Sequence, residues 1–240
     1  MMKKLDLLYS GKAKSVYKTE DRSTYLLEFR DNLTALNGEK KGSFEKKGMI
    51  NNKISNIIYK ELEKNGVKTH FIKQISDTEV LVKKAKLIDL EVVIRNVAAG
   101  SFSKRYGLSE GLPLSKPILE LFYKNDSLDD PFINDDGAIA LNIATKEEID
   151  IIKAFAYKTN EILKNIFDLV DLNLIDFKIE FGKTDDGEII LIDEISPDSC
   201  RLWAKGTNEK MDKDRFRRDL GGISEAYLAV LDKLINKYGE

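Results

Sequence analysis

The feature that most constrains this fold is a strictly alternating segment, LIDFKIEFG, at residues 174–182. Every second position from Ile175 to Phe181 is apolar, and the positions between them are charged. A period of two predicts a β-strand with one apolar face and one charged face. The segment EIILIDEIS at 188–196 follows the turn Asp186-Gly187, so we predict that the two segments form an antiparallel hairpin.

Further strands and helices are predicted along the rest of the chain. Runs rich in β-branched and aromatic residues predict strands at 16–18, 25–29, 69–76, 79–88 and 90–100. Apolar residues at helical spacing predict helices at 49–64 and 145–170 and a terminal helical region at 214–239. Thr145 and Glu148 form a capping-box pattern at the start of the second helix. Because strands and helices do not alternate as βαβ units, the predicted fold class is α+β with antiparallel sheets.

Composition excludes several classes of protein. The 39 basic and 41 acidic residues give a net charge of -2, which argues against bulk nucleic-acid binding. One cysteine cannot form an internal disulfide, and no apolar run is long enough for a signal peptide or a membrane span, so we expect a cytoplasmic protein. The single histidine, His70, argues against zinc sites and histidine-dependent nucleophiles, and it reads as a packed or surface residue.

Two acids of the predicted hairpin, Glu180 and Asp193, are expected to lie opposite each other. Facing carboxylates repel unless both are solvated or a divalent cation lies between them. The strand around Asp193 is strongly apolar, which favours the cation. Mg²⁺ is the expected metal, because it binds through one or two carboxylates together with substrate phosphates. A solvated pair is the alternative.

Two basic segments suggest anion binding. Lys12 and Lys14 follow Gly11, and in a strand residues two apart share a face, which suits a triphosphate although the Walker pattern is absent. The alternative is a solvated strand face. Arg95 lies in a buried-looking strand and needs a carboxylate or phosphate partner, and Ser101 could offer donors to an anion. The alternative there is a structural Arg–Asp pair with an N-cap serine.

Five segments in a fixed order carry a family resemblance: YSGKAKSVYK, EVVIRNVAAGS, IDFKIEFG, IDEISPDSCRLW and KDRFRRDLGG. From about Leu7 to the C-terminal helix, the chain resembles the phosphoribosylaminoimidazole-succinocarboxamide synthase (SAICAR synthetase) family of de novo purine synthesis. The resemblance implies an ATP-grasp-like fold with ATP between two α+β domains, a smaller nucleotide-binding one at 1–84 and a larger one at 85–240 that carries the substrate and metal site.

The resemblance also implies an activity. The family joins the carboxylate of carboxyaminoimidazole ribotide (CAIR) to the amine of L-aspartate, and ATP is converted to ADP and phosphate. A carboxylate is a poor electrophile, so an acyl phosphate is the expected intermediate. Its formation needs positioning and charge stabilisation more than a protein nucleophile, which agrees with the single histidine. A homodimer is the implied assembly.

Site residues are implied in the same way. The residues implied in catalysis and in contacts to the ATP phosphates and Mg²⁺ are Lys12, Lys14, Asp176, Lys178, Glu180 and Asp193. Glu180 and Asp193 are the implied metal ligands. Further nucleotide contacts fall to Val82, Lys83, Lys86 and Lys124, with 82–86 as a hinge beside adenine. Substrate contacts fall to Arg95, Ser101, Glu194, Asp198, Arg201, Lys213 and Arg217. The polar segment 33–48 reads as a loop, and Thr34–Lys41 is expected to close over the substrates.

Two rival functions are a small-molecule kinase with the same nucleotide site and a nucleotide-binding regulatory module without activity. The kinase would not need the segments 95–101 and 196–203, and the intact pair Glu180 and Asp193 argues against the inactive module. The family's usual RLWDKET reads RLWAKGT here, so Ala204 replaces an aspartate and Gly206 a glutamate. We interpret the missing acids as structural residues whose loss leaves activity intact, because exposed ion pairs contribute little to stability. Impaired loop order, aspartate binding or turnover is the alternative.

Overall fold

Two antiparallel sheets form the frame of the computed structural model, which describes residues 4–35 and 38–239. The first sheet has the order β1-β2-β3-β7-β6, with β1 at Leu7–Ser10, β2 at Lys14–Lys18, β3 at Thr24–Phe29, β6 at Phe71–Gln74 and β7 at Glu79–Lys83. The second sheet has the order β10-β9-β8-β11-β12, and β13 also pairs with β11. The strands of this sheet are β8 at Lys86–Val97, β9 at Pro113–Tyr123, β10 at Phe132–Ile133, β11 at Leu172–Lys183, β12 at Ile189–Ile192 and β13 at Cys200–Ala204. The predicted α+β class with antiparallel sheets is confirmed.

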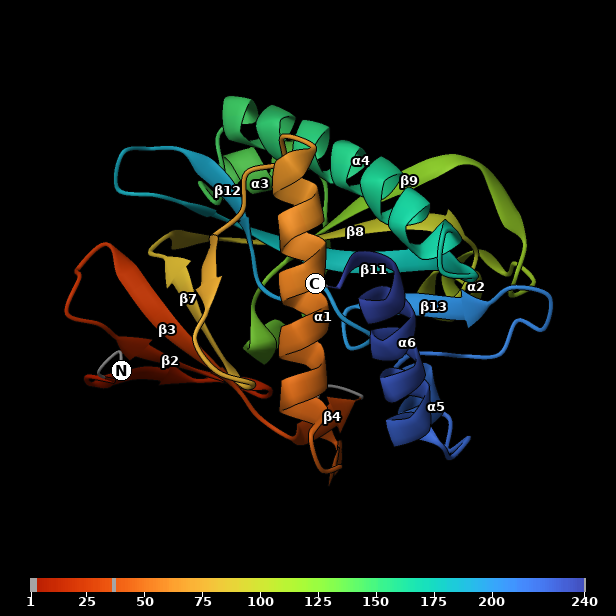
Figure 1. Ribbon diagram of the computed structural model, residues 1–240. Coiled ribbons are helices and arrows are strands. Elements are labelled where there is room, and N and C mark those ends of the chain that lie inside the picture. Colours follow the sequence, from red (N-terminus) through yellow and green to blue (C-terminus); the bar gives the residue numbers. More distant parts are fainter. Residues whose placement is uncertain (1–3, 36–37, 240) are drawn as a thin grey trace.

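Helices cover the second sheet and join it to the first (Figure 1). They are α1 at Lys47–Lys64, α2 at Gly100–Tyr106, α3 at Asp135–Ala140, α4 at Lys146–Asp168, α5 at Asp214–Arg217 and α6 at Ile223–Tyr238, with a 3-10 turn, η2, at Asp126–Leu128. The predicted capping box of α4 is present, because Thr145 accepts from the backbone of Glu148 while the Glu148 side chain accepts from that of Thr145.

Helix α1 is the element that links the two halves of the molecule. Its isoleucines Ile50, Ile54 and Ile58 are fully buried, and α1 packs against β3 and β6 on one side and against α6 on the other. Each such side chain contributes about 1.5–3 kcal/mol through burial. In Figure 1, α1 and α6 stand side by side between the first sheet and the layer formed by α4 and the second sheet. Helix α1 therefore connects the first sheet to α6 and α4.

The β11–β12 hairpin confirms the alternation seen in the sequence, with one change of interpretation. The apolar side of β11 is buried, and so are Asp176 and Glu180 on its charged side. That charged face therefore contacts protein and not bulk water. Buried carboxylates are stable only when they are paired, so this face requires specific cationic partners.

Two predictions of local structure are wrong. The segment 33–48 is not all loop, because β4 at Asn32–Ala35 pairs with β5 at Lys40–Ser43 and buries Leu33. The pairing depends on tertiary contacts that polar composition does not reveal, and residues 36–37 of the predicted closing loop lie outside the described ranges. The predicted single strand 79–88 breaks at residues 84–85, where the chain leaves the first sheet and enters the second.

Among the helices of the described ranges, not one combines the length and the apolar character that a membrane span requires.

Candidate active site

A cavity of about 970 Å³ is lined by residues of both sheets and contains most of the predicted site. The predicted residues on its wall are Lys12, Lys14, Val82, Lys83, Lys124, Lys178, Glu180, Asp193, Glu194, Asp198, Lys213 and Arg217. A second cavity, of about 150 Å³, is lined by Arg95, Ser101, Asp176 and Arg201. Because Lys178, Asp198, Ser199 and Arg217 line both, the two cavities adjoin and could hold two parts of one reaction.

Glu180 and Asp193 reach the wall of the large cavity by different routes. Glu180 pairs with Ile192, so the predicted pairing of Glu180 with Asp193 is wrong by one residue. In a regular strand, Asp193 would point to the opposite face from Ile192. Asp193 instead ends the strand with a φ of 68°, a left-handed conformation uncommon outside glycine, and its side chain lines the same cavity as Glu180.

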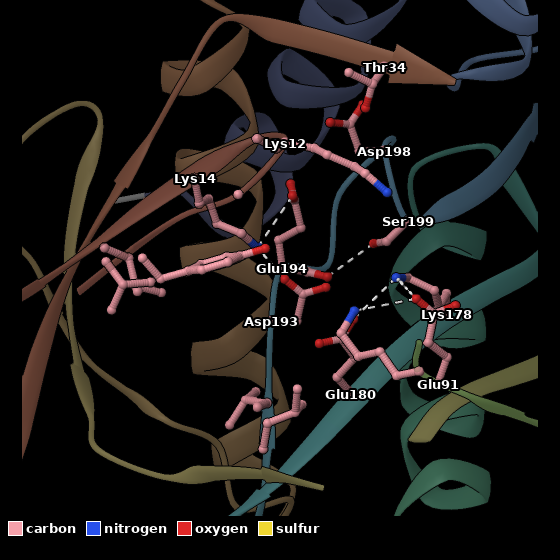
Figure 2. Close-up of a pocket in the computed structure, with 18 of the residues that line it drawn as sticks. Lys12, Lys14, Thr34, Glu91, Lys178, Glu180, Asp193, Glu194, Asp198 and Ser199 are labelled. Atoms are coloured by element: carbon pink, nitrogen blue, oxygen red, sulfur yellow. Dashed lines mark hydrogen bonds and ion pairs between the residues drawn. The ribbon is translucent and has the colours of Figure 1, made fainter. Parts of the chain in front are cut away.

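Lys14 reaches from β2 to the two acids that follow β12 (Figure 2). Its Nζ donates to Oδ1 of Asp193 and lies 3.4 Å from Oε1 of Glu194. Burial opposes the charge of Lys14, but Asp193 and Glu194 outweigh burial and raise the pKa of Lys14. Burial likewise opposes the charge of Asp193, and Lys14 and Lys178 outweigh it and lower the pKa of Asp193. Both groups therefore stay charged at neutral pH.

Glu180 accepts from two lysines of the second sheet. Lys124 Nζ lies 2.8 Å from Oε1 of Glu180, and Lys178 Nζ lies 3.2 Å from the same atom. Lys178 also donates to Oε1 of Glu91 at 2.6 Å, and in Figure 2 it stands between Glu91 and Glu180. The sequence reading missed Glu91. A charged residue in the apolar run LEVVIR is the signal that would have identified it.

The donor set fits a magnesium ion bound together with a nucleotide. Within the described ranges, no group of three or more His, Cys, Asp or Glu side chains is arranged to hold a metal by itself. Glu180 and Asp193 offer two carboxylates on one cavity wall. Mg²⁺ typically takes one or two carboxylates and completes its shell with phosphate oxygens and water.

The sequence predicted that Lys12 and Lys14 share one face of a strand, and this prediction is wrong. Lys12 lies in the bend before β2, whereas Lys14 is the first residue of that strand. Lys12 Nζ lies 3.1 Å from Oδ1 of Asp126 in the turn after β9, on the other sheet's side of the cavity. Asp126, which the sequence reading missed, thus joins the two sheets across the cavity mouth.

The predicted adenine hinge is only partly in the cavity. Val82 and Lys83 line it, and so do Ala85 and Leu87. Lys86 lines neither cavity, so its prediction as a nucleotide contact is not supported by its position. Alternation explains the position of Lys86 between Ala85 and Leu87, because neighbours in an extended chain point to opposite sides.

Arg95 in the second cavity has carboxylate partners within the protein. Its Nη1 donates to Oδ2 of Asp176 at 2.9 Å, and its Nε donates to Oε2 of Glu120 at 2.5 Å. Its Nη2 lies 3.4 Å from Oγ of Ser101. The structural Arg–Asp pair considered from the sequence is therefore present, but the N-cap serine is not, because Ala99 occupies the N-cap of α2.

Arg201 faces Arg95 across the shared Asp176. Its Nη1 donates to Oδ2 of Asp176 at 2.8 Å and its Nε to Oδ2 of Asp214 at 2.9 Å. A Cβ at Gly100 would lie 2.4 Å from Nη2 of Arg201, and Gly100 has a φ of +55°. Only glycine can therefore occupy this position beside the guanidinium.

Asp198 is held on the wall between the cavities by groups that the sequence reading missed. Tyr227 donates to its Oδ1 at 2.7 Å, and Nζ of Lys47 lies 2.5 Å from its Oδ2. Lys47 is 1% exposed at the first position of α1, although its polar surroundings in the sequence suggested a solvated lysine. Lys213 lies near this pair without an ion-pair partner of its own among the described residues, and burial lowers its pKa.

Two further side chains, Cys200 and His70, are packed inside the protein, in agreement with the sequence analysis. Cys200 is buried, and burial raises its thiol pKa. His70 is buried beside Tyr59, and burial followed by the charge of Lys14 lowers its pKa to about 3, so it is neutral. His70 also lines the large cavity, which its sequence context did not indicate.

Solved structures with this fold are SAICAR synthetases. One from Ehrlichia chaffeensis superposes with a TM-score of 0.93 at 43% identity, covering 95% of this chain and 98% of that one. A SAICAR synthetase in complex with ADP also gives 0.93, at 45% identity, with 97% and 99% covered. The resemblance in fold thus extends over nearly the whole of both chains.

Sequence relatives agree with the structural ones. The phosphoribosylaminoimidazole-succinocarboxamide synthases of Thermoanaerobacter sp. and Lachnoclostridium phytofermentans are 54% and 56% identical over 233 residues, which is 97% of this chain and 99% of each relative. The family described as SAICAR synthetase matches residues 7–234. The resemblance read from five short segments is confirmed, and the chain belongs to the SAICAR synthetase family.

Proposed function

We propose that this chain joins CAIR and L-aspartate in an ATP-dependent reaction that yields SAICAR, ADP and phosphate. Family membership supports the reaction, and one arrangement in the structure supports the assignment of parts. Lysines of the first sheet face the carboxylates Glu180 and Asp193 of the second across a large cavity, which opens into a smaller arginine-lined one. This arrangement suits transfer from a polyphosphate to a second substrate bound alongside.

The large cavity is proposed as the nucleotide site. Lys12 and Lys14 would bind the phosphates, the segment 82–83 would lie beside adenine, and Lys124 would also reach the nucleotide. Glu180 and Asp193 would hold Mg²⁺, which when bound supplies charge neutralisation at the phosphates. The residues themselves act by positioning, because phosphoryl transfer depends mainly on alignment and electrostatic stabilisation. An ADP complex of a relative at 45% identity is consistent with this nucleotide site.

The second cavity is proposed to hold the phosphate of CAIR. Arg95 and Arg201 present two planar guanidinium groups to it, and Ser101 adds a hydroxyl. Arginine suits phosphate because its fork makes paired, charge-assisted hydrogen bonds. The CAIR carboxylate would then lie near Lys178 and Asp198, at the place where the two cavities meet. That position brings the acceptor oxygen toward the nucleotide.

The amine of aspartate would attack the resulting acyl phosphate, forming the new C–N bond as phosphate leaves. Glu194, Lys213 and Arg217 lie on the same wall and are proposed to contact the substrates. We further propose that 1–84 and 85–240 act as two domains around the nucleotide, that β4–β5 helps to cover it, and that the protein works as a cytoplasmic homodimer.

The decisive test is a product assay with CAIR, L-aspartate and MgATP together. We expect SAICAR and ADP in equal amounts, and no sustained ADP release when either CAIR or aspartate is omitted. ADP release at the full rate without aspartate would indicate a kinase instead. Absence of both products with folded protein would indicate a binding module.

A further inference from the structure

The four carboxylates around the expected metal position are all engaged by lysines. Oδ1 of Asp193 accepts from Lys14, and Oε1 of Glu194 lies 3.4 Å from the same Nζ. Oε1 of Glu180 accepts from Lys124 and Lys178. Oε1 of Glu91 lies 2.6 Å from Lys178 and 3.5 Å from Lys124. Three ammonium groups therefore share four carboxylates on one wall.

These lysines come from different parts of the fold, which makes the arrangement more than a local ion pair. Lys14 is on β2 of the first sheet, Lys178 is on β11, and Lys124 follows β9. The side chains of the acids are between 7% and 20% exposed, so water provides little of their solvation. Without cationic partners, acids this close and this buried would repel one another.

A divalent cation and the lysines compete for the same carboxylates. A bound metal would supply two positive charges to Glu180 and Asp193, which already have lysine partners. Metal alone would have to displace these ammonium groups and leave them buried and unpaired, which is unfavourable. A nucleotide removes this obstacle, because its phosphates give the displaced lysines new anionic partners. Lysine suits such an exchange, since its flexible stem carries a single point charge.

We propose that Lys14, Lys124 and Lys178 take the place of the divalent cation until nucleotide arrives, so that metal enters this site with the nucleotide and not before it. The inference rests on the proposed function in taking Glu180 and Asp193 as the metal ligands. It adds an order of binding and a second role for the three lysines. Each of them first neutralises the acids and then moves to a phosphate.

The test measures metal binding without nucleotide, in the full-length chain. Mn²⁺ alone is titrated into the protein, and free Mn²⁺ is followed by its electron paramagnetic resonance signal. We expect weak binding to the wild type, and binding tighter by on the order of tenfold in the Lys14→Met, Lys124→Met double variant. The same double variant should bind ADP more weakly than the wild type. A gain in Mn²⁺ affinity together with a loss in ADP affinity is the result expected for lysines that pair first with the acids and then with the phosphates.

Two controls make the result specific. Lys83→Met removes a lysine that lines the same cavity but pairs with none of the four acids, so it should leave Mn²⁺ binding unchanged. Adding Glu180→Gln to the double variant should abolish the gained binding. If Lys83→Met gives the same gain, or the gain survives Glu180→Gln, the proposal is overturned.

A wild-type protein that binds Mn²⁺ alone as tightly as the double variant would also overturn it. Should the double variant fail to fold, Lys124→Met alone serves, because that side chain is 30% exposed and the change is expected to be tolerated; a smaller gain of the same sign is expected. No gain in that folded variant contradicts the proposal. The ligase assay is independent of these titrations, so failure of the proposed function would appear there and not here.

Discussion

The two cavities of this protein use different cations for different tasks. Apart from Arg217 and His70, the basic side chains that line the large cavity are lysines, and two of them, Lys12 and Lys14, reach from the first sheet to acids on the other side. The small cavity uses the arginines Arg95 and Arg201, and both belong to the second sheet together with the aspartate that they share. The contacts of Lys12 and Lys14 thus cross between the halves of the molecule, whereas the contacts of Arg95 and Arg201 stay within one half.

This difference is what a transfer reaction between two substrates requires. Arginines locked between Asp176 and other buried acids are preorganised, so a phosphate that docks there needs little rearrangement. Lysines carry a point charge on a flexible stem, so those that bridge the two halves can be redirected to a bound ligand. We interpret the small cavity as a fixed reference for the acceptor, and the large cavity as the part that adjusts to the nucleotide.

The largest expected effect tests the large cavity. Glu180→Gln keeps the size of the side chain but removes the charge that Lys124 and Lys178 neutralise and that the metal would need. We expect kcat/KM for SAICAR formation to fall about 100- to 1000-fold, in the range seen when a preorganised electrostatic contact is lost. The measurement is the product assay at saturating Mg²⁺.

Glu188→Gln is the matched control, because Glu188 lies on the same hairpin and pairs with an exposed lysine outside the site. It should retain full activity. Near-normal turnover of Glu180→Gln would remove Glu180 from the metal site and would leave the large cavity without its proposed central acid.

A smaller effect, confined to one substrate, tests the small cavity. A lysine in place of Arg201 has no planar fork, so it cannot bridge Asp176 and Asp214 and also make paired hydrogen bonds to a phosphate. We expect KM for CAIR to rise about 10- to 100-fold, the equivalent of one lost charge-assisted hydrogen bond or two. KM for ATP should change less than about twofold. Steady-state kinetics with each substrate varied in turn gives both values.

Arg215→Lys provides the comparison, since Arg215 lies nearby but pairs with Glu209 at the surface. It should change neither KM. Equal increases in KM for CAIR and ATP in Arg201→Lys would contradict the division of labour between the cavities.

The sequence predicted the framework of both cavities because their strands have clear local patterns. Alternation identified β11 and placed Asp176, Lys178 and Glu180 on one face. The position of Asp193 could not be obtained in this way, because it depends on a single left-handed residue that ends β12. A one-residue error in register reverses the direction of a side chain, and here a backbone irregularity compensates for it.

Buried charges were the least predictable part of the site. Lys47 lies in a polar, lysine-rich run that reads as solvent-exposed, and only Asp198, which arrives from the other half of the chain, makes its burial possible. Glu91 and Glu120 are single acids in apolar strands, which is a visible but unspecific signal. Their partners Lys178 and Arg95 are set by strand pairing, and a sequence without aligned relatives does not reveal that pairing.

Asp212, a buried acid two residues from Asp214, shifts its pKa in the opposite direction to Asp193 of the large cavity and gives a pH test. Burial, followed by the charge of Asp214, raises the pKa of Asp212 from 3.8 to about 7. The unfolded chain loses this proton near pH 4 while the folded protein keeps it, so the free energy of unfolding decreases from about pH 4 to 7 on account of this group. Its contribution to stability is complete below pH 4 and is lost as pH rises through 7.

Asp212→Asn should therefore have a shallower pH dependence than the wild type between pH 5 and 7, by up to about 1.4 kcal/mol per pH unit. Urea unfolding at several pH values measures the difference in slope, whatever the absolute stability of the variant. Asp219→Asn, a change at the surface, should leave the slope unchanged. Parallel curves for Asp212→Asn and the wild type would mean that Asp212 stays charged in the folded protein.

The smallest expected effect concerns Ala204, where the chain departs from its family. Ala204 ends β13 opposite Leu172 and lines neither cavity; its backbone bonds to Glu209 and Asn208, and its half-buried side chain packs against the main hydrophobic core. By strand alternation Ala204 lies on the same side of β13 as the buried Leu202, and Arg201 lies on the other side. We expect Ala204→Asp to change kcat/KM less than about twofold and to lower stability by about 1 kcal/mol, the typical cost of a single substitution. Activity assays and urea unfolding check both values, and a tenfold rise in turnover would mean that the absent acid limits this enzyme from outside its cavities.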